Sequence, residues 1–578
     1  MRQISFVIFL FIVALFPRIF LLDLVPFSMA HDELNYVLNA KSQFQAHENI
    51  PWTASALFSW GEKNFDPHTI ISEIPSLIIS IWIGPNNLSQ FNTRFPYAII
   101  SSFTVVLLYL ITKKVLNEKI AKIAGIFMAF NPWSIHFGRT ALETSFAIFF
   151  FLFGIFVLLK ANSWKMLFAF PIFLGGFLSY LGAKLLFLPI IMICLVFKFY
   201  AEKKTSKDIK PYLVFSVIAF ITVLSYFLTI NFQPAGVRKT ELVIFETEWA
   251  KGLVDGERQQ AIPNPLLEIF SNKATVILNR IADVYIAAYS TTSLFGKGET
   301  ISVYSIWQYG QFHYVDLPLI LMGIVGLFTL KRSIFWFIIA IIAVSPSVSA
   351  IDLVEKTYAV RAFPMFPFLV ILSAVGFWYI LEKIRFGKIL ALFIATLYII
   401  SVGYFLHLYL FRYPIFSAER WFFSERLMAN YARLAQDNPI INKVYVVTRE
   451  KATWVFEEYL FYSGIYNKAE DVKAVNEKMR IRDFSDRKVI FLNKCPDVKL
   501  GQDEVLIADR RLECNKEEVG GHGFVDLKDA GTVAVITNDL LCKNIPNLPR
   551  YYRITDINLF RIERLSVEEF CRNWVVKF

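Results

Sequence analysis

The sequence predicts a polytopic α-helical membrane protein with a soluble α/β domain at its C-terminal end. Of the 578 residues, 56% are hydrophobic and 16% are aromatic, including 58 Phe. The mean hydropathy is +0.48, far above what the core of a soluble protein of this length requires. Apolar runs alternate with short basic segments along the first 411 residues, whereas the last part of the chain is polar.

Membrane spans are predicted from apolar runs of roughly 17 to 25 residues, the length needed to cross a bilayer. The first run carries Pro17 and Arg18 near its end and has no small-residue cleavage site, so we expect a retained helix and not a secretory signal. The runs at 165–180 and 185–200 are short. The predicted spans are residues 4–22, 95–112, 120–137, 142–159, 165–180, 185–200, 211–230, 314–330, 333–350, 362–380 and 389–411.

The distribution of Lys and Arg predicts the topology. With the N-terminus in the cytoplasm, every inner connection is basic, as short cytoplasmic loops usually are. These connections carry Lys113, Lys114, Lys119, Lys122, Lys160, Lys165, Lys198, Lys203, Lys204, Lys207, Lys210, Lys331, Arg332, Lys383, Arg385 and Lys388. Residues 23–94, 231–313 and 412–578 are then extracytoplasmic, and we expect the chain in a plasma membrane or cell inner membrane.

Residues 412–578 are predicted to form a small extracytoplasmic α/β domain, separate from a transmembrane region at 1–411. A helical pattern covers 418–436, and short β-like runs follow at 444–448, 489–492, 505–507 and 533–536. Four of the five cysteines lie in this domain: Cys495, Cys514, Cys542 and Cys571. They form either two disulfides or four free thiols, because spacing alone does not fix pairing.

Several classes of function lack support. The net charge of +11 is spread over many loops and forms no single basic face, so nucleic acid is not an expected partner. P-loop and GxGxxG motifs are absent, as are CxxC and HExxH zinc spacings. His31, His68 and His136 are scattered, and we interpret them as hydrogen-bonded structural groups. No metal ligands are assigned, and the sequence neither requires nor excludes a divalent cation.

Charged residues at the outer ends of the spans are the candidates for chemistry. Asp32 and Glu33 follow the first span in a helix-like stretch that includes Tyr36. Adjacent helical residues point about 100° apart, so one carboxylate can face a cavity while the other bonds to the scaffold. Glu73 precedes the second span and Arg94 opens it. Arg94 either binds a ligand or extends to the lipid headgroups.

Further candidates lie in later outer turns. Arg139 and Glu143 stand at i and i+4, a spacing that allows a helical ion pair or a shared polar face. Tyr180 and Lys184 lie in the predicted turn between the fifth and sixth spans, and Arg361 opens the tenth. Cations at one membrane face suit a phosphate ligand.

These motifs resemble the GT-C glycosyltransferases of the protein O-mannosyltransferase type, glycosyltransferase family 39, which in turn resemble the lipid A aminoarabinose transferases. The resemblance covers roughly residues 1–410, and the turn from Asn131 to Glu143 is its most specific element. The matching positions are Asp32, Glu33 and Tyr36; Glu73 and Pro75; Arg94 and Pro96; Asn131 to Glu143; and Arg361, Pro364 and Pro367.

The resemblance implies an inverting transfer of one sugar from a polyprenyl-phosphate donor to a protein, lipid or glycan acceptor on the outer side. Asp32 is then the general base, and Glu33, Glu73 and Tyr36 support the base or the acceptor. Lys184 departs from the Arg that related sequences often carry, and binds phosphate as a point charge instead of a fork. The remaining donor-binding residues would be Arg94, Arg139, Glu143, Tyr180 and Arg361.

Two alternatives remain open. An oligosaccharyltransferase-like or ligase-like enzyme would move a whole glycan, and the loop at 231–313 does not distinguish it. A transporter or flippase would place its charges near the middle of the membrane and would show internal repeats. Here the charges gather at one face and the sequence contains no repeat.

Overall fold

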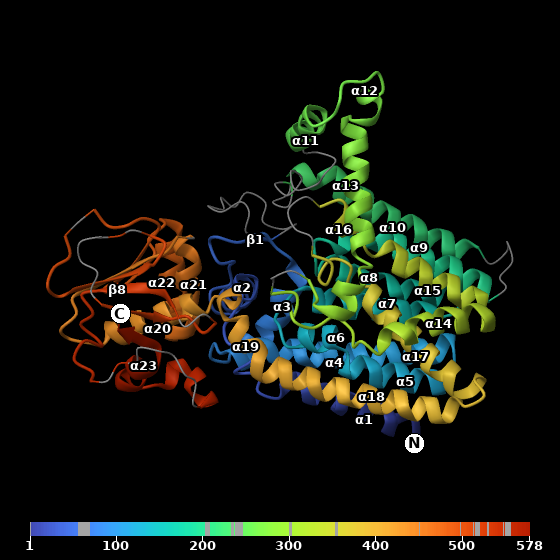
Figure 1. Ribbon diagram of the computed structural model, residues 1–578, viewed down its shortest axis with the longest axis horizontal. Coiled ribbons are helices and arrows are strands. Elements are labelled where there is room, and N and C mark those ends of the chain that lie inside the picture. Colours follow the sequence, from blue (N-terminus) through green and yellow to red (C-terminus); the bar gives the residue numbers. More distant parts are fainter. Residues whose placement is uncertain are drawn as a thin grey trace.

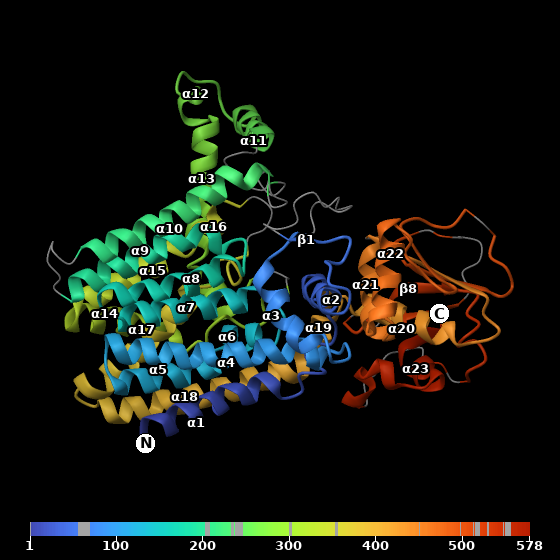
Figure 2. The ribbon, with the colours of Figure 1, turned by 180° about the vertical axis from the view of Figure 1, so that it is seen from behind.

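The computed structural model describes residues 2–55, 70–202, 209–232, 236, 247–299, 303–352, 357–449, 451–497, 499–512, 514, 521–528, 531–546, 548 and 556–577. His68 lies outside the described residues. The chain forms a bundle of nearly parallel helices, an α/β domain beyond one end of the bundle, and a helical arm that projects from its side (Figures 1 and 2).

Apolar helices occupy all of the predicted spans. Six helical stretches are long and apolar enough to cross a membrane: Gln90–Val115, Ala183–Ala201, Lys210–Phe232, Arg332–Ala350, Met365–Lys383 and Gly387–Phe416. The protein is an integral membrane protein. The bundle contains α1 (Arg2–Ile19), α4 (Gln90–Val115), α5 (Glu118–Phe130), α6 (Pro132–Gly138), α7 (Thr144–Lys160), α8 (Ala169–Phe177), α9 (Ala183–Ala201), α10 (Lys210–Thr229), α14 (Asp316–Leu330), α15 (Arg332–Val344), α17 (Met365–Lys383) and α18 (Gly387–His407).

Three predicted spans are interrupted helices. The range 120–137 divides into α5 and α6 at Asn131, whose side chain accepts a hydrogen bond from the Ser134 amide at 3.0 Å and so caps α6. Pro132 follows as the first residue of α6, because a proline there needs no backbone donor. The range 165–180 begins with a 3₁₀ turn, Ser163–Phe168, and 333–350 divides into α15 and α16 (Ser347–Ala350).

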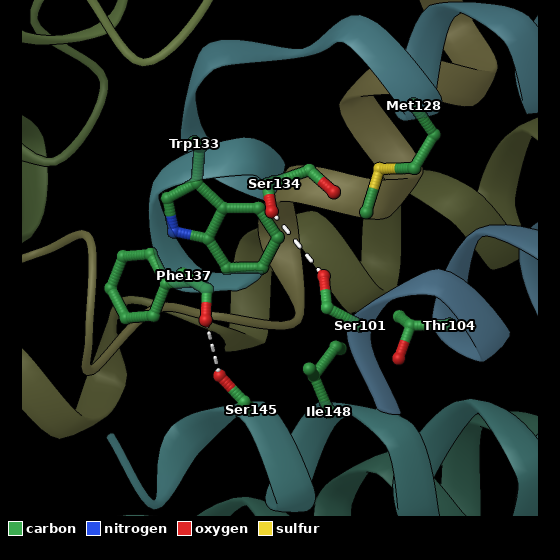
Figure 3. A pocket seen from close by; sticks show the side chains of 8 residues that line it. All are labelled: Ser101, Thr104, Met128, Trp133, Ser134, Phe137, Ser145 and Ile148. Carbon is green, nitrogen blue, oxygen red and sulfur yellow. Dashed lines mark hydrogen bonds between the residues drawn. The ribbon is translucent and has the colours of Figure 1, made fainter. Parts of the chain in front are cut away.

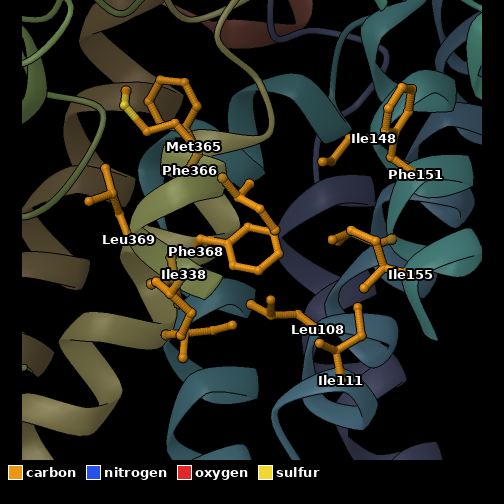
Figure 4. Packing of buried hydrophobic residues seen from close by; sticks show 14 of the residues in the cluster. Leu108, Ile111, Ile148, Phe151, Ile155, Ile338, Met365, Phe366, Phe368 and Leu369 are labelled. Atoms are coloured by element: carbon orange, nitrogen blue, oxygen red, sulfur yellow. The ribbon is translucent and has the colours of Figure 1, made fainter. Parts of the chain in front are cut away.

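The core of the bundle consists of large aliphatic and aromatic side chains. Leu108 and Ile111 of α4 pack with Ile155 of α7 and Phe368 of α17 (Figure 4). α14 and α17 approach as closely as glycine permits, because a Cβ added at Gly376 would lie 1.9 Å from the Leu319 carbonyl oxygen. Such close packing gives the bundle a rigid frame.

The C-terminal domain contains α20 (Phe423–Gln436), α21 (Ala452–Ser463), α22 (Ala469–Arg480) and α23 (Val567–Trp574) around one sheet. The strand order is β4-β5-β3-β6-β8-β7-β9, with β3 parallel to β5 and β6 and the other pairs antiparallel. All four predicted runs lie in strands. The strands are β3 (Lys443–Val447), β4 (Ser485–Asp486), β5 (Val489–Leu492), β6 (Glu504–Asp509), β7 (His522–Val525), β8 (Thr532–Thr537) and β9 (Val575–Lys577).

The cysteines of this domain form two disulfides, Cys495–Cys514 and Cys542–Cys571. This resolves the choice that spacing left open. Cys194 is free and buried in α9. Disulfides persist in oxidising compartments, which agrees with an extracytoplasmic position for the domain.

The first outer loop connects the bundle to the C-terminal domain. It contains α2 (His31–Gln45), a two-stranded pairing of β1 (Ala54–Ser55) with β2 (Ile70–Ile71), and α3 (Glu73–Ile83). Arg426 of α20 donates to the Phe27 carbonyl and pairs with Glu563 at 2.7 Å. The Asn476 amide of α22 donates to Ser42 of α2 at 2.9 Å. These contacts fix the domain over one end of the bundle, the end predicted to be extracytoplasmic.

Candidate functional site

The two adjacent carboxylates at the start of α2 have opposite environments. Asp32 is exposed, whereas Glu33 is fully buried. Glu33 accepts a hydrogen bond from the Ala30 amide at 3.0 Å and so closes the first turn of the helix. The geometry expected for neighbouring helical residues is therefore present, with one carboxylate on the scaffold and one facing outward.

Glu33 is the centre of a buried ion pair with Arg94. The guanidinium of Arg94 grips both carboxylate oxygens, with N···O distances of 3.0 and 2.8 Å. It also donates to the carbonyls of Pro26 and Ser28 at 2.8 and 2.6 Å. The Ala141 amide adds a further bond to Glu33 at 2.6 Å. Four donated bonds occupy Arg94, and the pair joins α2, α4 and the turn after α6.

Arg139 caps the end of α1. Its four hydrogen bonds all go to backbone carbonyl oxygens, at 2.7 to 3.2 Å: those of Pro17, Phe20, Leu21 and Val25. Of these residues only Pro17 belongs to α1, and the Leu21 carbonyl also accepts from the Leu24 and Val25 amides, so the buried guanidinium mainly holds the turn that follows the helix. The helical i,i+4 arrangement with Glu143 is not formed, because α6 ends at Gly138 and α7 begins at Thr144. We call Glu33, Arg94 and Arg139 the buried ion cluster.

The exposed carboxylate leads to a second set of polar groups. Asp32 Oδ2 accepts a hydrogen bond from the Tyr304 hydroxyl at 2.8 Å. Tyr36 lies one helical turn further along α2, and its hydroxyl accepts from the Ser72 amide at 2.9 Å. Ser72 precedes Glu73, the first residue of α3. Asp32 and Tyr36 therefore lie on one side of α2, and the bond from Tyr36 to Ser72 brings this side of α2 to the start of α3, where Glu73 lies.

Glu143 lies within electrostatic range of two tyrosines from different parts of the chain, Tyr36 and Tyr180. Burial and the Glu143 carboxylate raise the pKa of Tyr36 well above its usual value. Burial and Glu143 also raise the pKa of Tyr180, against the effect of Arg361, which hydrogen-bonds the Tyr180 side chain. Both phenols therefore stay neutral and act as hydrogen-bonding groups.

Two cations complete this set. Arg361 pairs with Asp352 at 3.1 Å and contacts Tyr180. Lys184 is buried at the start of α9, where Nζ donates to the Phe177 carbonyl at 3.2 Å. The ammonium lies 5.4 Å from the ring of Tyr226 and within electrostatic range of Glu73. We call the whole set the polar cluster: Asp32, Tyr36, Glu73, Glu143, Tyr180, Lys184 and Arg361.

The structure adds two residues that sequence reasoning missed. Tyr304 holds Asp32 from a segment 272 residues away, a separation that no local pattern reveals. Asp352 pairs with Arg361, and its place nine residues earlier in a polar segment was a detectable signal. No predicted site residue falls outside the described part of the chain.

His31 and His136, which the sequence analysis considered as possible metal ligands, contact aromatic rings and hydrogen-bonding groups. The His31 ring lies 3.8 Å from that of Phe422 and 4.3 Å from that of Trp454. His136 makes hydrogen bonds with the Tyr409 hydroxyl at 3.0 Å and the Val303 carbonyl at 2.8 Å. Within the described ranges, no three His, Cys, Asp or Glu side chains are arranged to hold a metal ion.

A small cavity lies inside the bundle, between α4, α5, α6 and α7 (Figure 3). It is lined by Ser101, Ser134 and Ser145 together with apolar groups, and offers about 10 Å³. Arg18 donates to the hydroxyls of Ser101 and Ser134 at 2.9 and 2.6 Å. The space suits about one water molecule and is too small for a sugar.

A comparison with protein families identifies part of the chain. Residues 76–227 match the family described as dolichyl-phosphate-mannose-protein mannosyltransferase. These residues are similar to that family, and we call them the mannosyltransferase-type segment. The resemblance predicted from the sequence is thereby confirmed over these residues. The comparison with curated protein sequences finds no match.

The mannosyltransferase-type segment contains half of the residues in the buried ion cluster and the polar cluster. It includes Arg94, Arg139, Glu143, Tyr180 and Lys184, and ends with α10. Asp32, Glu33 and Arg361 lie on either side of it. The segment therefore supplies Glu143, Tyr180 and Lys184 to the polar cluster, the first outer loop supplies Asp32, Tyr36 and Glu73, and Arg361 comes from a later part of the chain.

Solved structures with a similar course of the chain have low sequence identity. The oligosaccharyltransferase AglB from Archaeoglobus fulgidus, in complex with an inhibitory peptide and a dolichol-phosphate, has 12% identity and a TM-score of 0.47 over 90% of this chain and 72% of that chain. ArnT from Cupriavidus metallidurans in the apo state has 12% identity and a TM-score of 0.48 over 93% and 98%. ArnT bound to undecaprenyl phosphate has 10% identity and a TM-score of 0.41 over 93% and 97%. Scores below 0.5 at such identity carry no functional conclusion.

Proposed function

We propose that the protein is a glycosyltransferase that moves one sugar from a polyprenyl-phosphate donor to an acceptor at the extracytoplasmic face, with inversion at the anomeric carbon. The observation that carries the proposal is the polar cluster, in which an exposed carboxylate and two cations border the outer end of a membrane-embedded bundle. The mannosyltransferase-type segment supports the reaction class.

Asp32 is proposed as the general base. Its side chain is exposed, and the Tyr304 hydroxyl holds Oδ2 while the carboxylate keeps a second oxygen for an acceptor proton. A base within hydrogen-bond reach of the acceptor hydroxyl removes its proton as the new bond forms. Glu73 and Tyr36 lie beside this position and would orient the acceptor.

Arg361 and Lys184 are proposed to bind the donor phosphate. Negative charge develops on the leaving phosphate as the bond to the sugar breaks, and a fixed cation stabilises it. Arg361 is held in place by Asp352 at 3.1 Å and by Tyr180, so its guanidinium is oriented before the donor arrives. Tyr180 and Glu143 offer hydrogen-bonding groups for the sugar hydroxyls.

The buried ion cluster is proposed to position the base and not to touch substrate. The Arg94 guanidinium donates four hydrogen bonds to protein groups, and the Arg139 guanidinium donates to four backbone carbonyls. Glu33 fixes the first turn of α2, the turn that carries Asp32. These assignments keep Glu33 as support for the base and move Arg94 and Arg139 from donor binding to support.

The membrane-embedded bundle supports a lipid-linked donor. A polyprenyl tail dissolves in the bilayer and confines its phosphosugar to the membrane surface, where the polar cluster lies. Base and leaving-group cations on opposite sides of the sugar produce inversion. We place the N-terminus in the cytoplasm and the C-terminal domain outside, where it caps the cluster and faces the acceptor.

The proposal is tested with the purified protein in lipid vesicles, supplied with labelled polyprenyl-phosphate sugars and a membrane extract as the source of acceptor. We expect label on the acceptor with inverted anomeric configuration, and no transfer by Asp32→Asn. Asp471→Asn is the matched control, because Asp471 is also an exposed aspartate in the first turn of a helix. Movement of intact donor between leaflets without transfer, or transfer of whole glycans only, would contradict the proposal.

A further inference from the structure

A helical arm projects from the bundle at residues 247–287. It consists of α11 (Thr247–Gln259), α12 (Leu267–Phe270) and α13 (Lys273–Ala287). α13 runs across the direction of the membrane helices and away from them, and α11 lies beside it on the side nearer the C-terminal domain (Figures 1 and 2). The arm therefore extends parallel to the plane of the membrane.

The depth of the arm is fixed by two hydrogen bonds at its base. The Tyr285 hydroxyl donates to the Ala343 carbonyl at 2.7 Å, and the Tyr289 hydroxyl donates to the Ile342 carbonyl at 3.1 Å. Both carbonyls belong to the last turn of α15, at the end opposite to the basic turn Lys331–Arg332. Ile342 and Ala343 belong to the half of the stretch Arg332–Ala350 that lies away from Lys331, so the arm leaves the bundle in the predicted outer half of this span.

The two faces of α13 differ in burial. Val276 and Val284 are buried, and α11 packs along this helix. At 100° per residue, positions 278, 282 and 286 lie on the opposite side. They carry Leu278, Ala282 and Ile286, and the two large side chains are 63% and 67% exposed. Because α11 lies toward the C-terminal domain, this exposed apolar stripe faces the bilayer.

The tip of the arm is also apolar. Ile262, Leu266, Ile269 and Phe270 are all more than half exposed, and Phe270 is 68% exposed. α11, by contrast, presents Lys251, Asp255 and Glu257 to solvent. Charges of both signs nearly balance along residues 247–287. The arm thus has a polar side directed outward and an apolar side directed at the membrane.

We propose that the arm lies in the outer interface of the same bilayer that holds the bundle, with the stripe and the tip inserted at the boundary between headgroups and acyl chains. Amphipathic helices bind membranes in this manner when their apolar face is exposed. The apolar surface continues onto α10, where Leu228 is 65% exposed. Because the charges of the arm nearly balance, we expect its contact with the membrane to depend on apolar insertion and not on anionic lipid. The inference is independent of the reaction catalysed.

Spin labels test this proposal in the full-length protein in phosphatidylcholine vesicles. On a Cys194→Ala background, one label is placed by Leu278→Cys or Phe270→Cys, and the matched control by Asp255→Cys on the outward side of α11. Collision rates are measured with molecular oxygen, which concentrates in lipid, and with a water-soluble nickel chelate. We expect an oxygen-to-nickel ratio several-fold higher at positions 278 and 270 than at 255, unchanged when anionic lipid is added.

Two results would overturn the proposal. High nickel accessibility at positions 278 and 270 would place the stripe and tip in water. Low collision rates with both reagents would show that protein covers these positions, as in contact between two copies of the chain. The thermal unfolding midpoint of each labelled protein, compared with that of the Cys194→Ala background, confirms that the protein is folded.

Discussion

The buried ion cluster and the polar cluster begin at neighbouring residues and differ in almost every other respect. Glu33 is enclosed by Arg94 and two backbone amides, whereas Asp32 is exposed and held by one tyrosine hydroxyl. A carboxylate whose lone pairs are all used stabilises structure, and one with an available oxygen can take a proton. Charge type alone therefore does not distinguish support from chemistry; the set of partners does.

The largest effect is expected when the buried ion cluster is broken. Arg94→Leu leaves Glu33 buried without its cation, which costs about 3–5 kcal/mol of folding free energy. We expect a large fall in the thermal unfolding midpoint or in the yield of folded protein. Arg572→Leu is the control, because Arg572 belongs to an exposed i,i+4 pair with Glu568 that contributes about 0–1 kcal/mol. Equal midpoints for the two variants would show that the buried pair is not structural.

Substitutions in the polar cluster should change substrate binding and not the stability of the fold. Arg361→Gln removes a charge-assisted contact to the donor phosphate worth about 1.5–3 kcal/mol, so donor affinity should fall about 10- to 100-fold. Titration with a labelled polyprenyl-phosphate sugar measures this change, and Arg385→Gln, at an exposed position in the predicted cytoplasmic turn, is the control. Unchanged affinity in Arg361→Gln would remove Arg361 from the phosphate site.

Glu419, near the start of the C-terminal domain, offers a further comparison with Glu33, because one of its carboxylate oxygens has no hydrogen-bond partner among the described residues. Burial and the nearby Glu425 raise the pKa of Glu419 to about 8. The folded state therefore keeps a proton that the unfolded state loses above its ordinary value, and stability should fall as pH rises through the window from about 4.5 to about 8. The slope is at most about 1.4 kcal/mol per pH unit for this group.

Glu419→Gln should reduce that slope, since the amide does not titrate. Unfolding midpoints at pH 5, 6.5 and 8 for wild type and variant measure the effect. Identical pH dependence in the two proteins would mean that Glu419 ionises at its ordinary pKa in the folded state.

The smallest effect concerns the contact that holds Asp32. Tyr304→Phe keeps the ring and removes the hydroxyl, a loss of about 0.5–1.5 kcal/mol that should slow transfer about 2- to 10-fold. Tyr304 acts through Asp32, so kcat should fall while KM for the donor stays the same. A raised donor KM with unchanged kcat would point to a direct donor contact instead.

The sequence predicted the bundle well because long apolar runs have few alternatives in a membrane. It also predicted four adjacent strands of the C-terminal domain and the different environments of Asp32 and Glu33, of which one is exposed and the other bonded to the scaffold. Partners were harder to predict. Arg139 binds backbone carbonyls, which no residue pattern marks, and Tyr304 reaches Asp32 across 272 positions. The Asn131-Pro132 pair indicates the break between α5 and α6, but the apolar residues on both sides of it predict one continuous span.

The central claim is tested most directly by comparing Asp32→Asn with Glu33→Gln in one preparation, measuring sugar transfer and the fraction of folded protein for each. We expect Asp32→Asn to fold like wild type and to lose at least about 100-fold in transfer rate, the contribution of a general base. Glu33→Gln should lose folded protein, with transfer lowered in proportion. Near-normal transfer by folded Asp32→Asn would contradict the account.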